Sequence, residues 1–384
     1  MSEFFLHSFN TLSHGLIGYI VPFLFVLTVV VFFHELGHFL VARWAGVKVL
    51  TFSLGFGPEL AGFNDRHGTR WKISAIPLGG YVKFFGDDSE ASTPSPEMLA
   101  SMTEEERAGS FHYKKVGPRA AIVAAGPIAN FLLAIVIFTC LFTFLGKPST
   151  TARVDQVEAG SAAAAAGFQV GDVVTTIDGR KIGSFSDMQR IVSIRAGEPL
   201  TFTIRRGDST LQLRGTPELR EVKDPFGNAH RVGVLGITRK MVAGDSTTER
   251  VDPATAFWLG IKETWFVVDR TLAYVGGVFT GREAADQVGG PLRIAQISGQ
   301  VATIGGLGAL VQLAAVLSIS IGLLNLFPVP LLDGGHLLFY TIEAVRGRPL
   351  SERAQEMGFR IGLGLVLMLM VFATYNDILH LAAS

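Results

Sequence analysis

Long stretches without a charged side chain limit the folds open to this chain of 384 residues. Four such stretches run for 15 residues or more without Asp, Glu, Lys or Arg, at residues 16–33, 120–145, 304–327 and 361–375. About 20 apolar residues span a bilayer as a helix, so the first three stretches are long enough and the fourth needs its flanks. We therefore expect a polytopic α-helical membrane protein with four transmembrane segments, at residues 14–44, 120–146, 301–346 and 357–378.

The overall composition indicates a water-facing part in addition to these helices. Hydrophobic residues make up 48% of the chain and charged residues 17%, which suits membrane helices joined to at least one soluble domain. The net charge of +0 gives no indication of a nucleic-acid partner. The single cysteine, Cys140, excludes an intramolecular disulfide. Residues 1–13 lack the basic region of a cleaved signal peptide, so we expect the first helix to be retained.

Lys and Arg residues predict the orientation in the membrane, because they concentrate in cytoplasmic loops. Residues 41–119 contain ten of them and residues 336–360 contain four, whereas residues 1–15 and 376–384 contain none. We expect both termini and the long segment 146–303 to face outward. In a bacterium the membrane would be the cytoplasmic (inner) membrane.

The outward segment is expected to hold one small α+β domain, at residues 150–240. Alternating apolar residues predict strands there, with a hairpin turn at Gly207 and Asp208. After it, residues 252–281 have the periodicity of an amphipathic helix that carries Trp258 and Trp265 on its apolar side. This helix could pack on the β domain or lie on the membrane interface, and the third apolar stretch that follows favours the interface.

On the cytoplasmic side, residues 45–119 contain two strand-like segments, "KVLTFSLGFG" and "RWKISAIPLGGYVKFFG". Glycine pairs interrupt them, as expected of a β-hairpin region. We expect residues 45–119 to form a β-loop region on the cytoplasmic side.

The first apolar stretch ends in "HELGH", residues 34–38. On a helix His34 and His38 share one face, so two neutral imidazoles can bind one metal ion, and Glu35 is close enough to take a proton from metal-bound water. This is the H-E-x-x-H pattern of zinc hydrolases. Ionisable residues inside a membrane segment indicate a functional site.

A third ligand must come from elsewhere, because catalytic zinc sites usually have three protein ligands. Asp333, in "NLFPVPLLDGGHLL", is the strongest candidate, since Pro328 and Pro330 break the helix before it. Broken helices at membrane depth are tolerated where they line a polar cavity. Two alternatives stay open: Asp333 could cap the next helix, and His336 could be the ligand.

Three motifs together resemble the site-2 protease family of intramembrane zinc metalloproteases, and the bacterial regulator-of-sigma-E protease group in particular. They are "HELGH" at 34–38, "GPIAN" at 126–130 and "NLFPVPLLDGG" at 325–335. The resemblance implies one zinc ion per chain, bound by His34, His38 and Asp333, with Glu35 as catalytic acid and base. It also implies that Asn325 helps to hold the substrate backbone.

The outward domain resembles a PDZ domain through "GSAAAAAGFQVGDVVTTIDGRKI". "GVLGI" at 233–237 resembles the loop that receives a peptide carboxylate in such domains, which would make Gly233, Leu235, Gly236 and Ile237 peptide-binding residues, although a plain strand is equally compatible. Close relatives can carry two such domains, and this chain has room for one.

"AIPLGGYVKF" resembles a membrane-associated β-loop of the same family. By that resemblance Gly79, Gly80 and Tyr81 offer an edge strand to an unwound substrate. The alternative is a plain cytoplasmic hairpin.

We therefore expect an intramembrane zinc endopeptidase whose active site faces the cytoplasmic half of the bilayer. By resemblance, its substrates are single-pass membrane proteins such as anti-sigma factors and also remnant signal peptides. Two rival hypotheses are a non-catalytic scaffold that binds peptides through its PDZ-like domain and a membrane metal transporter. The intact H-E-x-x-H motif argues against the first, and the scarcity of charges in the last three apolar stretches argues against the second.

Overall fold

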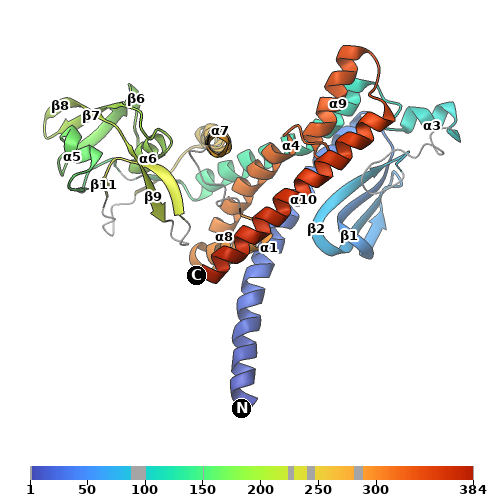
Figure 1. The fold of residues 1–384 in the computed structure, drawn as a ribbon, viewed down its shortest axis with the longest axis horizontal. Coiled ribbons are helices and arrows are strands. Elements are labelled where there is room, and N and C mark those ends of the chain that lie inside the picture. Colours follow the sequence, from blue (N-terminus) through green and yellow to red (C-terminus); the bar gives the residue numbers. More distant parts are fainter. Residues whose placement is uncertain are drawn as a thin grey trace. The chain divides into compact units, whose positions relative to one another are not determined.

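The computed structural model describes residues 2–87, 101–149, 151–223, 229–239, 247–280 and 289–383. The chain forms two compact units, and each is described by itself. The helical unit consists of residues 1–138, 260–268 and 288–384, and the β-rich unit consists of residues 139–259 and 269–287. Figure 1 shows the elements of both.

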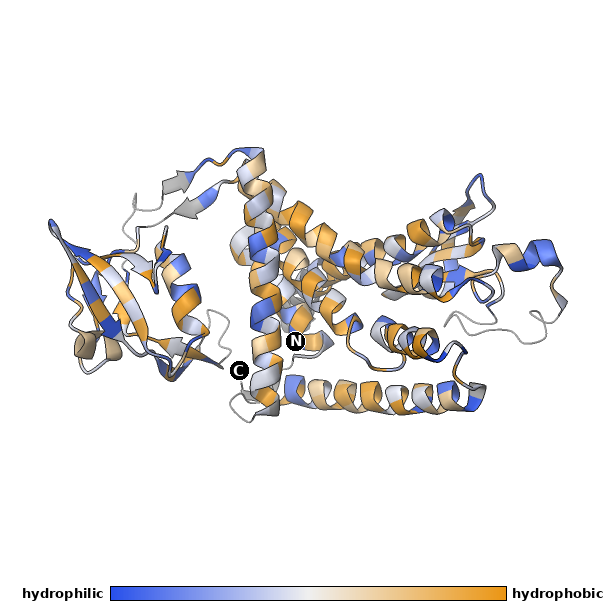
Figure 2. Ribbon diagram, turned by 90° about the horizontal axis from the view of Figure 1, so that it is seen from above, coloured by the Kyte–Doolittle hydropathy of each residue, from blue (hydrophilic) through white to orange (hydrophobic). Residues whose placement is uncertain are grey.

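Four described helices are long and apolar enough to cross a membrane, which confirms the expected number. They are α1 (Ser2–Trp44), α4 (Val116–Phe144), α8 (Pro291–Asn325) and α10 (Glu352–Ala383). Figure 2 shows that hydrophobic residues dominate these long helices.

The third of these helices begins before the expected segment 301–346, within which a break at Pro328 and Pro330 was expected. Helix α8 begins at Pro291, where proline is favoured because it has no N–H to leave unpaired. The buried carboxylate of Asp377, on α10, accepts hydrogen bonds from the backbone N–H groups of Gly290, Leu292 and Arg293. Helix α8 ends at Asn325, and a separate helix, α9 (Asp333–Arg346), follows. Only Arg293 in its first turns is charged, and the uncharged run extends over residues 294–332, so the expected segment started later than this run does.

Small residues let three of the helices approach closely. A methyl group at Gly37 of α1 would overlap the Ala125 carbonyl of α4, and one at Gly322 of α8 would lie 3.1 Å from Cβ of Asn130, also on α4. Close contact of backbones through glycine is typical of membrane helices, where packing replaces the hydrophobic effect. These contacts place α4 against both α1 and α8, and α1 also packs directly on α8 through Val26, Val30, Leu310 and Ala314.

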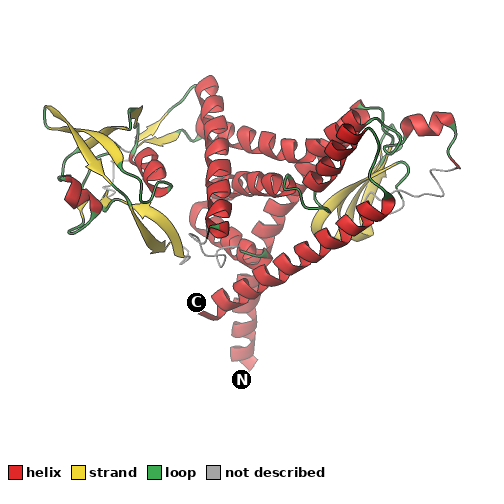
Figure 3. Ribbon diagram, turned by 45° about the horizontal axis from the view of Figure 1, so that its top comes forward, coloured by secondary structure: helices red, strands yellow, loops and turns green. Residues whose placement is uncertain are grey.

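Two long strands, β1 (Val49–Asn64) and β2 (Arg70–Phe84), form the sheet of the helical unit (Figure 3). Each strand bends, so residues 51–54 pair on one side with 80–83 and on the other with 70–73, while residues 61–64 pair with 70–73. Segment 80–84 is therefore an edge of the sheet among the described residues. A short helix, α3 (Glu104–Gly109), follows the sheet in the chain.

The sheet is anchored to the helices by a core of aromatic and β-branched side chains. Phe52 is 1% exposed and contacts Phe39 of α1 at a ring-centroid distance of 5.6 Å, and Val82 and Ile122 belong to the same cluster. Burying several such side chains is worth roughly 1.5–3 kcal/mol each. This core fixes segment 80–84 against the C-terminal part of α1.

The β-rich unit has its own buried core, which includes Val154, Val174, Leu200 and Phe202. Its main sheet has the strand order β6–β5–β7–β8, and β4, β9, β10, β11, β3 and β12 form three further pairs. The elements are β3 (Lys147–Ser149), β4 (Gln156–Val157), α5 (Ala162–Ala166), β5 (Val173–Ile177), β6 (Arg180–Lys181), α6 (Phe185–Ser193), β7 (Leu200–Arg206), β8 (Ser209–Gly215), β9 (Glu218–Lys223), β10 (Ala229–Val234), β11 (Ile237–Thr238) and β12 (Thr247–Glu249).

The expected hairpin turn lies between β7 and β8, where Arg206 pairs with Ser209 across Gly207 and Asp208. Gly207 has a φ of +58°, a conformation that costs glycine little. The expected amphipathic helix is α7 (Pro253–Phe279), which exposes both Trp258 and Trp265 and is not among the four helices suited to span a membrane.

Candidate metal centre

Helix α1 places His34 and His38 one turn apart at the end of its apolar stretch. Both imidazoles point their Nε2 atoms at each other, 3.2 Å apart. The Oδ2 atom of Asp333 lies 3.2 Å from His34 Nε2 and 3.6 Å from His38 Nε2. Among the described residues, these three side chains form the group that could hold a metal ion.

The spacing of these three atoms fits zinc. A tetrahedral site with bonds of about 2.0–2.1 Å to nitrogen and oxygen keeps its ligand atoms about 3.3 Å apart. The observed separations of 3.2, 3.2 and 3.6 Å lie around that value. Asp333 Oδ2 is also buried without a hydrogen-bond partner, so three atoms with lone pairs converge on one point. Such a cluster is stable when a cation lies at its centre.

The loop before Asp333 explains how a carboxylate reaches the histidines. Pro328 and Pro330 cannot donate backbone hydrogen bonds, and α8 ends before them. A methyl group at Gly334 would overlap the carbonyls of Leu326 and Phe327, so only glycine allows this tight return. The N-cap of α9 is Leu332, with no side-chain cap, and Asp333 is already inside the helix. The carboxylate therefore does not serve as a helix cap.

The outward nitrogens of the two histidines have partners on α4. His38 Nδ1 lies 2.8 Å from the carbonyl oxygen of Ile122, to which it donates. His34 Nδ1 lies 3.2 Å from Nδ2 of Asn130, a residue that is completely buried. Partners of this kind orient the imidazole rings of metal ligands.

Gly126 of α4 forms the wall of the cluster. A methyl group there would overlap His38 Nε2 and would lie 2.9 Å from His34 Cε1. Any larger residue would occupy the space between the imidazoles and α4. The sequence motif "GPIAN" therefore supplies both the gap, at Gly126, and the polar side chain, at Asn130. Sequence reasoning gave these two residues no role, although a polar residue inside an apolar stretch is a useful sign.

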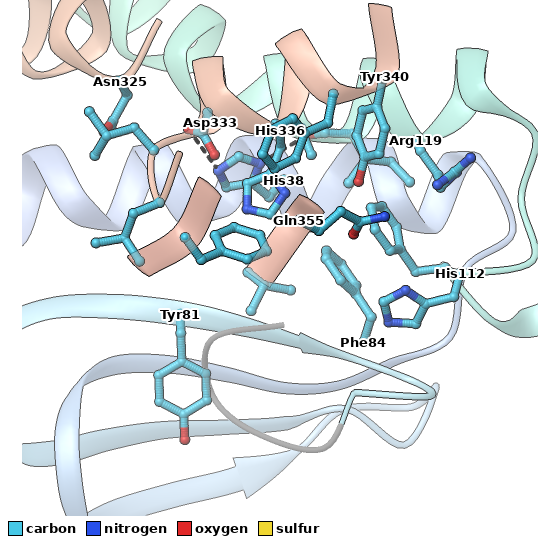
Figure 4. Close-up of a pocket in the computed structure, with 18 of the residues that line it drawn as sticks. His38, Tyr81, Phe84, His112, Arg119, Asn325, Asp333, His336, Tyr340 and Gln355 are labelled. Atoms are coloured by element: carbon cyan, nitrogen blue, oxygen red, sulfur yellow. Dashed lines mark hydrogen bonds and ion pairs between the residues drawn. The ribbon is translucent and has the colours of Figure 1, made fainter. Parts of the chain in front are cut away.

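Glu35 and the edge of the sheet line the cavity that opens on the cluster. The cavity has a volume of about 850 Å³, and its wall includes Glu35, Gly80, Tyr81 and Asn325. A methyl group at Gly80 would lie 3.1 Å from Cγ of Glu35, so segment 80–84 passes directly beside this residue. Gly79 is next along the strand, with a φ of +130°. The ring of Tyr81 is directed away from Asp333 (Figure 4) and stacks on Phe56.

Asn325 and His336 lie near the cluster without joining it. Asn325 is the last residue of α8, and its Nδ2 lies 3.4 Å from His34 Nε2. His336 lines the same cavity and packs against Tyr340 and Phe359, as Figure 4 shows for the first of these. The structure thus brings Asp333, and not His336, to the two histidines.

A second set of polar residues lines the cavity away from the cluster. Arg119 of α4 forms an ion pair with Glu343 and lies over the Tyr340 ring, 4.8 Å from its centre. His112 lies 2.8 Å from the buried carboxylate of Asp87. Sequence analysis did not single out these residues, because no local pattern brings them together.

The four residues of "GVLGI" proposed to bind a peptide lie in the β-rich unit. Leu235 is 4% exposed and belongs to its core, and the Leu235 and Gly236 carbonyls accept hydrogen bonds from Ala163 and Glu158. Gly233 is the partner of Leu219 in the pairing of β10 with β9, and Ile237 begins β11.

The chain is similar to known proteins over most of its length. The family model of peptidase family M50 matches residues 22–369. A protein of Agrobacterium fabrum named as a zinc metalloprotease is 53% identical over 363 residues, covering 94% of this chain and 96% of that protein. Metalloprotease MmpA of Caulobacter vibrioides is 40% identical over 385 residues, covering 95% of this chain and 96% of its own.

One solved structure is also similar in part. The PDZ domain of an SdrC-like protein from Listeria monocytogenes covers 24% of this chain and 87% of that chain, with 22% identity and a TM-score of 0.19. That score carries no weight for the fold.

Apolar helices of membrane length and a cluster of two histidines and a carboxylate beside a glutamate define a metal-dependent hydrolase of membrane character. The match over most of the sequence makes the class specific: the chain belongs to peptidase family M50 and is a zinc metalloprotease.

Proposed function

We propose that this protease cuts single-pass membrane proteins inside the bilayer, at one zinc ion held by His34, His38 and Asp333. The observation that carries the proposal is the position of the cluster. His34 and His38 belong to the apolar helix Ile17–Trp44, which is long enough to span a membrane, and His34 is only 8% exposed. A peptide bond must reach that depth to be hydrolysed.

The residues divide the chemistry among them. Zinc bound to the cluster supplies a Lewis acid and lowers the pKa of water. Glu35 takes the proton from the attacking water and delivers it to the amide nitrogen of the leaving group, as a general base and then a general acid. We infer that the amide of Asn325, which lines the cavity at the end of α8, donates a hydrogen bond to the substrate backbone.

Segment 80–84 supports a role for Gly79, Gly80 and Tyr81 in binding the substrate. It is an edge of the sheet among the described residues, and it lines the cavity beside Glu35. A helical substrate must unwind before cleavage, and an edge strand offers hydrogen-bond partners to the extended backbone. Gly80 allows this backbone to approach α1 closely. The ring of Tyr81 packs on Phe56, so we infer that this residue contributes its backbone, and not its ring, to substrate binding.

The edge-strand hypothesis is testable by crosslinking. Leu78, 55% exposed, precedes the edge, and Leu60, 70% exposed, lies in the part of the sheet near the other edge. Single cysteines at these two positions in an inactive Glu35→Gln, Cys140→Ser background would be oxidised with substrates carrying one cysteine near the cut site. We expect disulfide formation at position 78 and much less at position 60. Equal crosslinking at both positions would contradict the proposal.

The natural substrates are proposed from the resemblance described above: anti-sigma-factor-like single-pass proteins already shortened outside the membrane, and remnant signal peptides. The excess of Lys and Arg in residues 41–119 supports an orientation in the inner membrane with that region in the cytoplasm. The active site would then face the cytoplasmic half of the bilayer, and the β-rich unit would lie outside.

The test of the function uses purified full-length protein and a single-pass substrate reconstituted in the same lipid vesicles. We expect cleavage within the substrate's apolar segment, located by mass spectrometry, and inhibition by 1,10-phenanthroline that zinc reverses. Cleavage confined to water-exposed loops, at the same rate with soluble casein as substrate, would show an ordinary surface protease instead.

We also propose that residues 150–240 form a PDZ-like domain that excludes substrates with large external portions. The core around Phe202 supports an independently packed domain. A domain of about 90 residues has a radius of gyration near 12–13 Å, which is comparable with the width of a helix entry path. Binding of new C-termini at the "GVLGI" segment would add selectivity. The alternative is that this segment is only a structural strand.

Replacing residues 150–240 by a flexible bridge tests the exclusion. We expect the shortened protease, loaded with zinc, to cut a substrate that still carries a folded external domain, which the full chain refuses. A shortened protease that cuts the small substrate normally and still refuses the large one would contradict the exclusion role.

A further inference from the structure

Asn130 is the buried polar residue beside His34, and its hydrogen bonds are incomplete. It is 0% exposed in the middle of an apolar helix, and its main-chain carbonyl accepts a hydrogen bond of 2.9 Å from the Ser318 hydroxyl of α8. Its side-chain Nδ2 lies 3.2 Å from His34 Nδ1, and its Oδ1 is buried without a partner. A buried acceptor without a partner is destabilising, so the position of Oδ1 has to be explained.

The orientation of the amide is linked to the tautomer of His34. When Nδ2 donates to Nδ1, Nδ1 carries the lone pair and Nε2 carries the proton, which then faces Asp333 Oδ2, 3.2 Å away. A histidine that binds zinc through Nε2 needs the opposite tautomer, with the proton on Nδ1.

The amide of Asn130 can serve both tautomers of His34. A rotation of 180° about its terminal bond exchanges Oδ1 and Nδ2, and Oδ1 then accepts a hydrogen bond from His34 Nδ1–H. The Nε2 lone pair of His34 is then free to bind the ion. His38 differs, because its Nδ1 faces the Ile122 carbonyl, a fixed acceptor that holds one tautomer permanently.

We propose that Asn130 is a positioning residue that switches His34 between its two tautomers, donating to Nδ1 in one and accepting from Nδ1–H when zinc is bound. This inference rests on the proposed ligand set and adds to it. Zinc uptake then requires the His34 proton to lie on Nδ1 and the Asn130 amide to turn, without any movement of a helix.

The proposal makes an unusual prediction about substitutions. An aspartate at this position can only accept, so it favours the tautomer that binds zinc, in the manner of the carboxylate–histidine pairs common at zinc sites. A leucine of similar size neither donates nor accepts. Loss of such a partner typically lowers metal affinity about 10–100-fold. We therefore expect Asn130→Asp to bind zinc at least as tightly as wild type, and wild type to bind it much more tightly than Asn130→Leu.

A purely structural role predicts the opposite order. Asn130 packs against Gly322 of α8 in a dry interior, where a new carboxylate is far more costly than an apolar side chain of similar volume. If Asn130 only filled space and joined helices, Asn130→Asp would be the more damaging change. The two explanations therefore predict opposite orders for Asn130→Asp and Asn130→Leu.

The experiment measures zinc dissociation constants of the purified full-length variants by competition with a fluorescent chelator, in detergent. Asn130→Asp, Asn130→Leu and Ser318→Ala are compared with wild type. Ser318→Ala is the matched control, because it removes the bond to the Asn130 main chain and leaves the contact with His34. The absorption bands of the cobalt-substituted proteins report ligand geometry independently of affinity.

The expected result is a 10–100-fold weaker zinc affinity for Asn130→Leu, an unweakened affinity for Asn130→Asp, and a change of less than about threefold for Ser318→Ala. Weaker binding by Asn130→Asp than by Asn130→Leu, or equal losses in Asn130→Leu and Ser318→Ala, would overturn the proposal. His34→Ala separates this failure from failure of the ligand set. If His34→Ala retains wild-type zinc affinity, the ligand assignment itself is wrong.

Discussion

Gly126 offers the sharpest test of where the metal lies. The change Gly126→Ala adds one methyl group, which would overlap His38 Nε2 and would lie 2.9 Å from His34 Cε1, whereas ordinary van der Waals contact begins at 3.4 Å. The methyl group and the His38 ring must separate by about 1 Å to relieve this overlap. Metal–ligand distances tolerate only about 0.2 Å. We therefore expect zinc affinity to fall by more than about 100-fold, beyond the usual effect of losing a ligand's hydrogen-bond partner.

The cost of Gly126→Ala to folding should be small by comparison. Extra volume in a packed interior costs about 1–3 kcal/mol, and replacing glycine by alanine within a helix returns about 1 kcal/mol. The net destabilisation is then at most about 2 kcal/mol. Loss of zinc from a protein that is still folded is the signature of a local effect.

Gly117→Ala is the matched control for this change. It lies on the same helix, and nothing in the structure comes within 4 Å of a methyl group there. Zinc content is measured by mass spectrometry after gel filtration, affinity by chelator competition, and stability by thermal unfolding in detergent. A Gly126→Ala protein that keeps wild-type zinc affinity and cuts substrate would refute the placement of the ion beside α4.

Three further predictions follow from the site and from the β-rich unit. Glu35→Gln should keep zinc while peptide hydrolysis falls about 10²–10⁴-fold, as measured by product formation in vesicles; undiminished cleavage would exclude Glu35 as the base. Asp333→Asn should lose both zinc retention and activity, and full activity with normal zinc content would direct attention to another ligand. Arg206→Leu should destabilise the β-rich unit, because Arg206 pairs through Nε and Nη2 with the buried carboxylate of Asp172, at 2.7 and 2.8 Å. Limited proteolysis should detect that change while zinc content stays constant.

The parts of the fold that depend on local pattern could be predicted from the sequence. The four apolar helices follow from the absence of charge over 15 or more residues, and the turn at Gly207 follows from alternating strands on either side. The start of α8 could not be placed in this way. Its first turn is held by the carboxylate of Asp377, more than 80 residues away, which no local pattern contains.

The bends of β1 and β2 are equally non-local. Sequence pattern indicated a hairpin region, yet residues 51–54 have neighbours on both sides, at 80–83 and 70–73. The aromatic core between the sheet and α1, around Phe39 and Phe52, determines which segment of the bent strands forms the edge of the sheet. The edge at Gly80 and Tyr81 therefore emerges only from the folded sheet.

The candidate site likewise contains residues that a local pattern predicts and residues that only the fold brings together. The spacing of His34, Glu35 and His38 is a property of one helix, so the histidine pair is readable from five consecutive residues. Asp333 required reasoning about broken helices, which left His336 as an alternative until the loop geometry separated them. Asn130 and Gly126 carry no such local pattern, because their roles depend on α4 lying against α1 at the distance that Gly37 permits.

The same contact explains why the cluster needs α4 at all. Two histidines on α1 alone would be free to rotate about their side-chain bonds, and each neutral ring could present either nitrogen to the ion. The Ile122 carbonyl holds the ring of His38 through Nδ1. The Asn130 amide holds the ring of His34 in the same way, so that by our proposal the His34 tautomer changes while the ring stays in place. A substitution that widens the gap between α1 and α4, such as Gly37→Leu, should therefore weaken zinc binding although it touches no ligand, and Asp333, held by its own loop, should not compensate. Chelator competition on Gly37→Leu checks this, and an unchanged affinity in that variant would show that α1 and the Asp333 loop suffice.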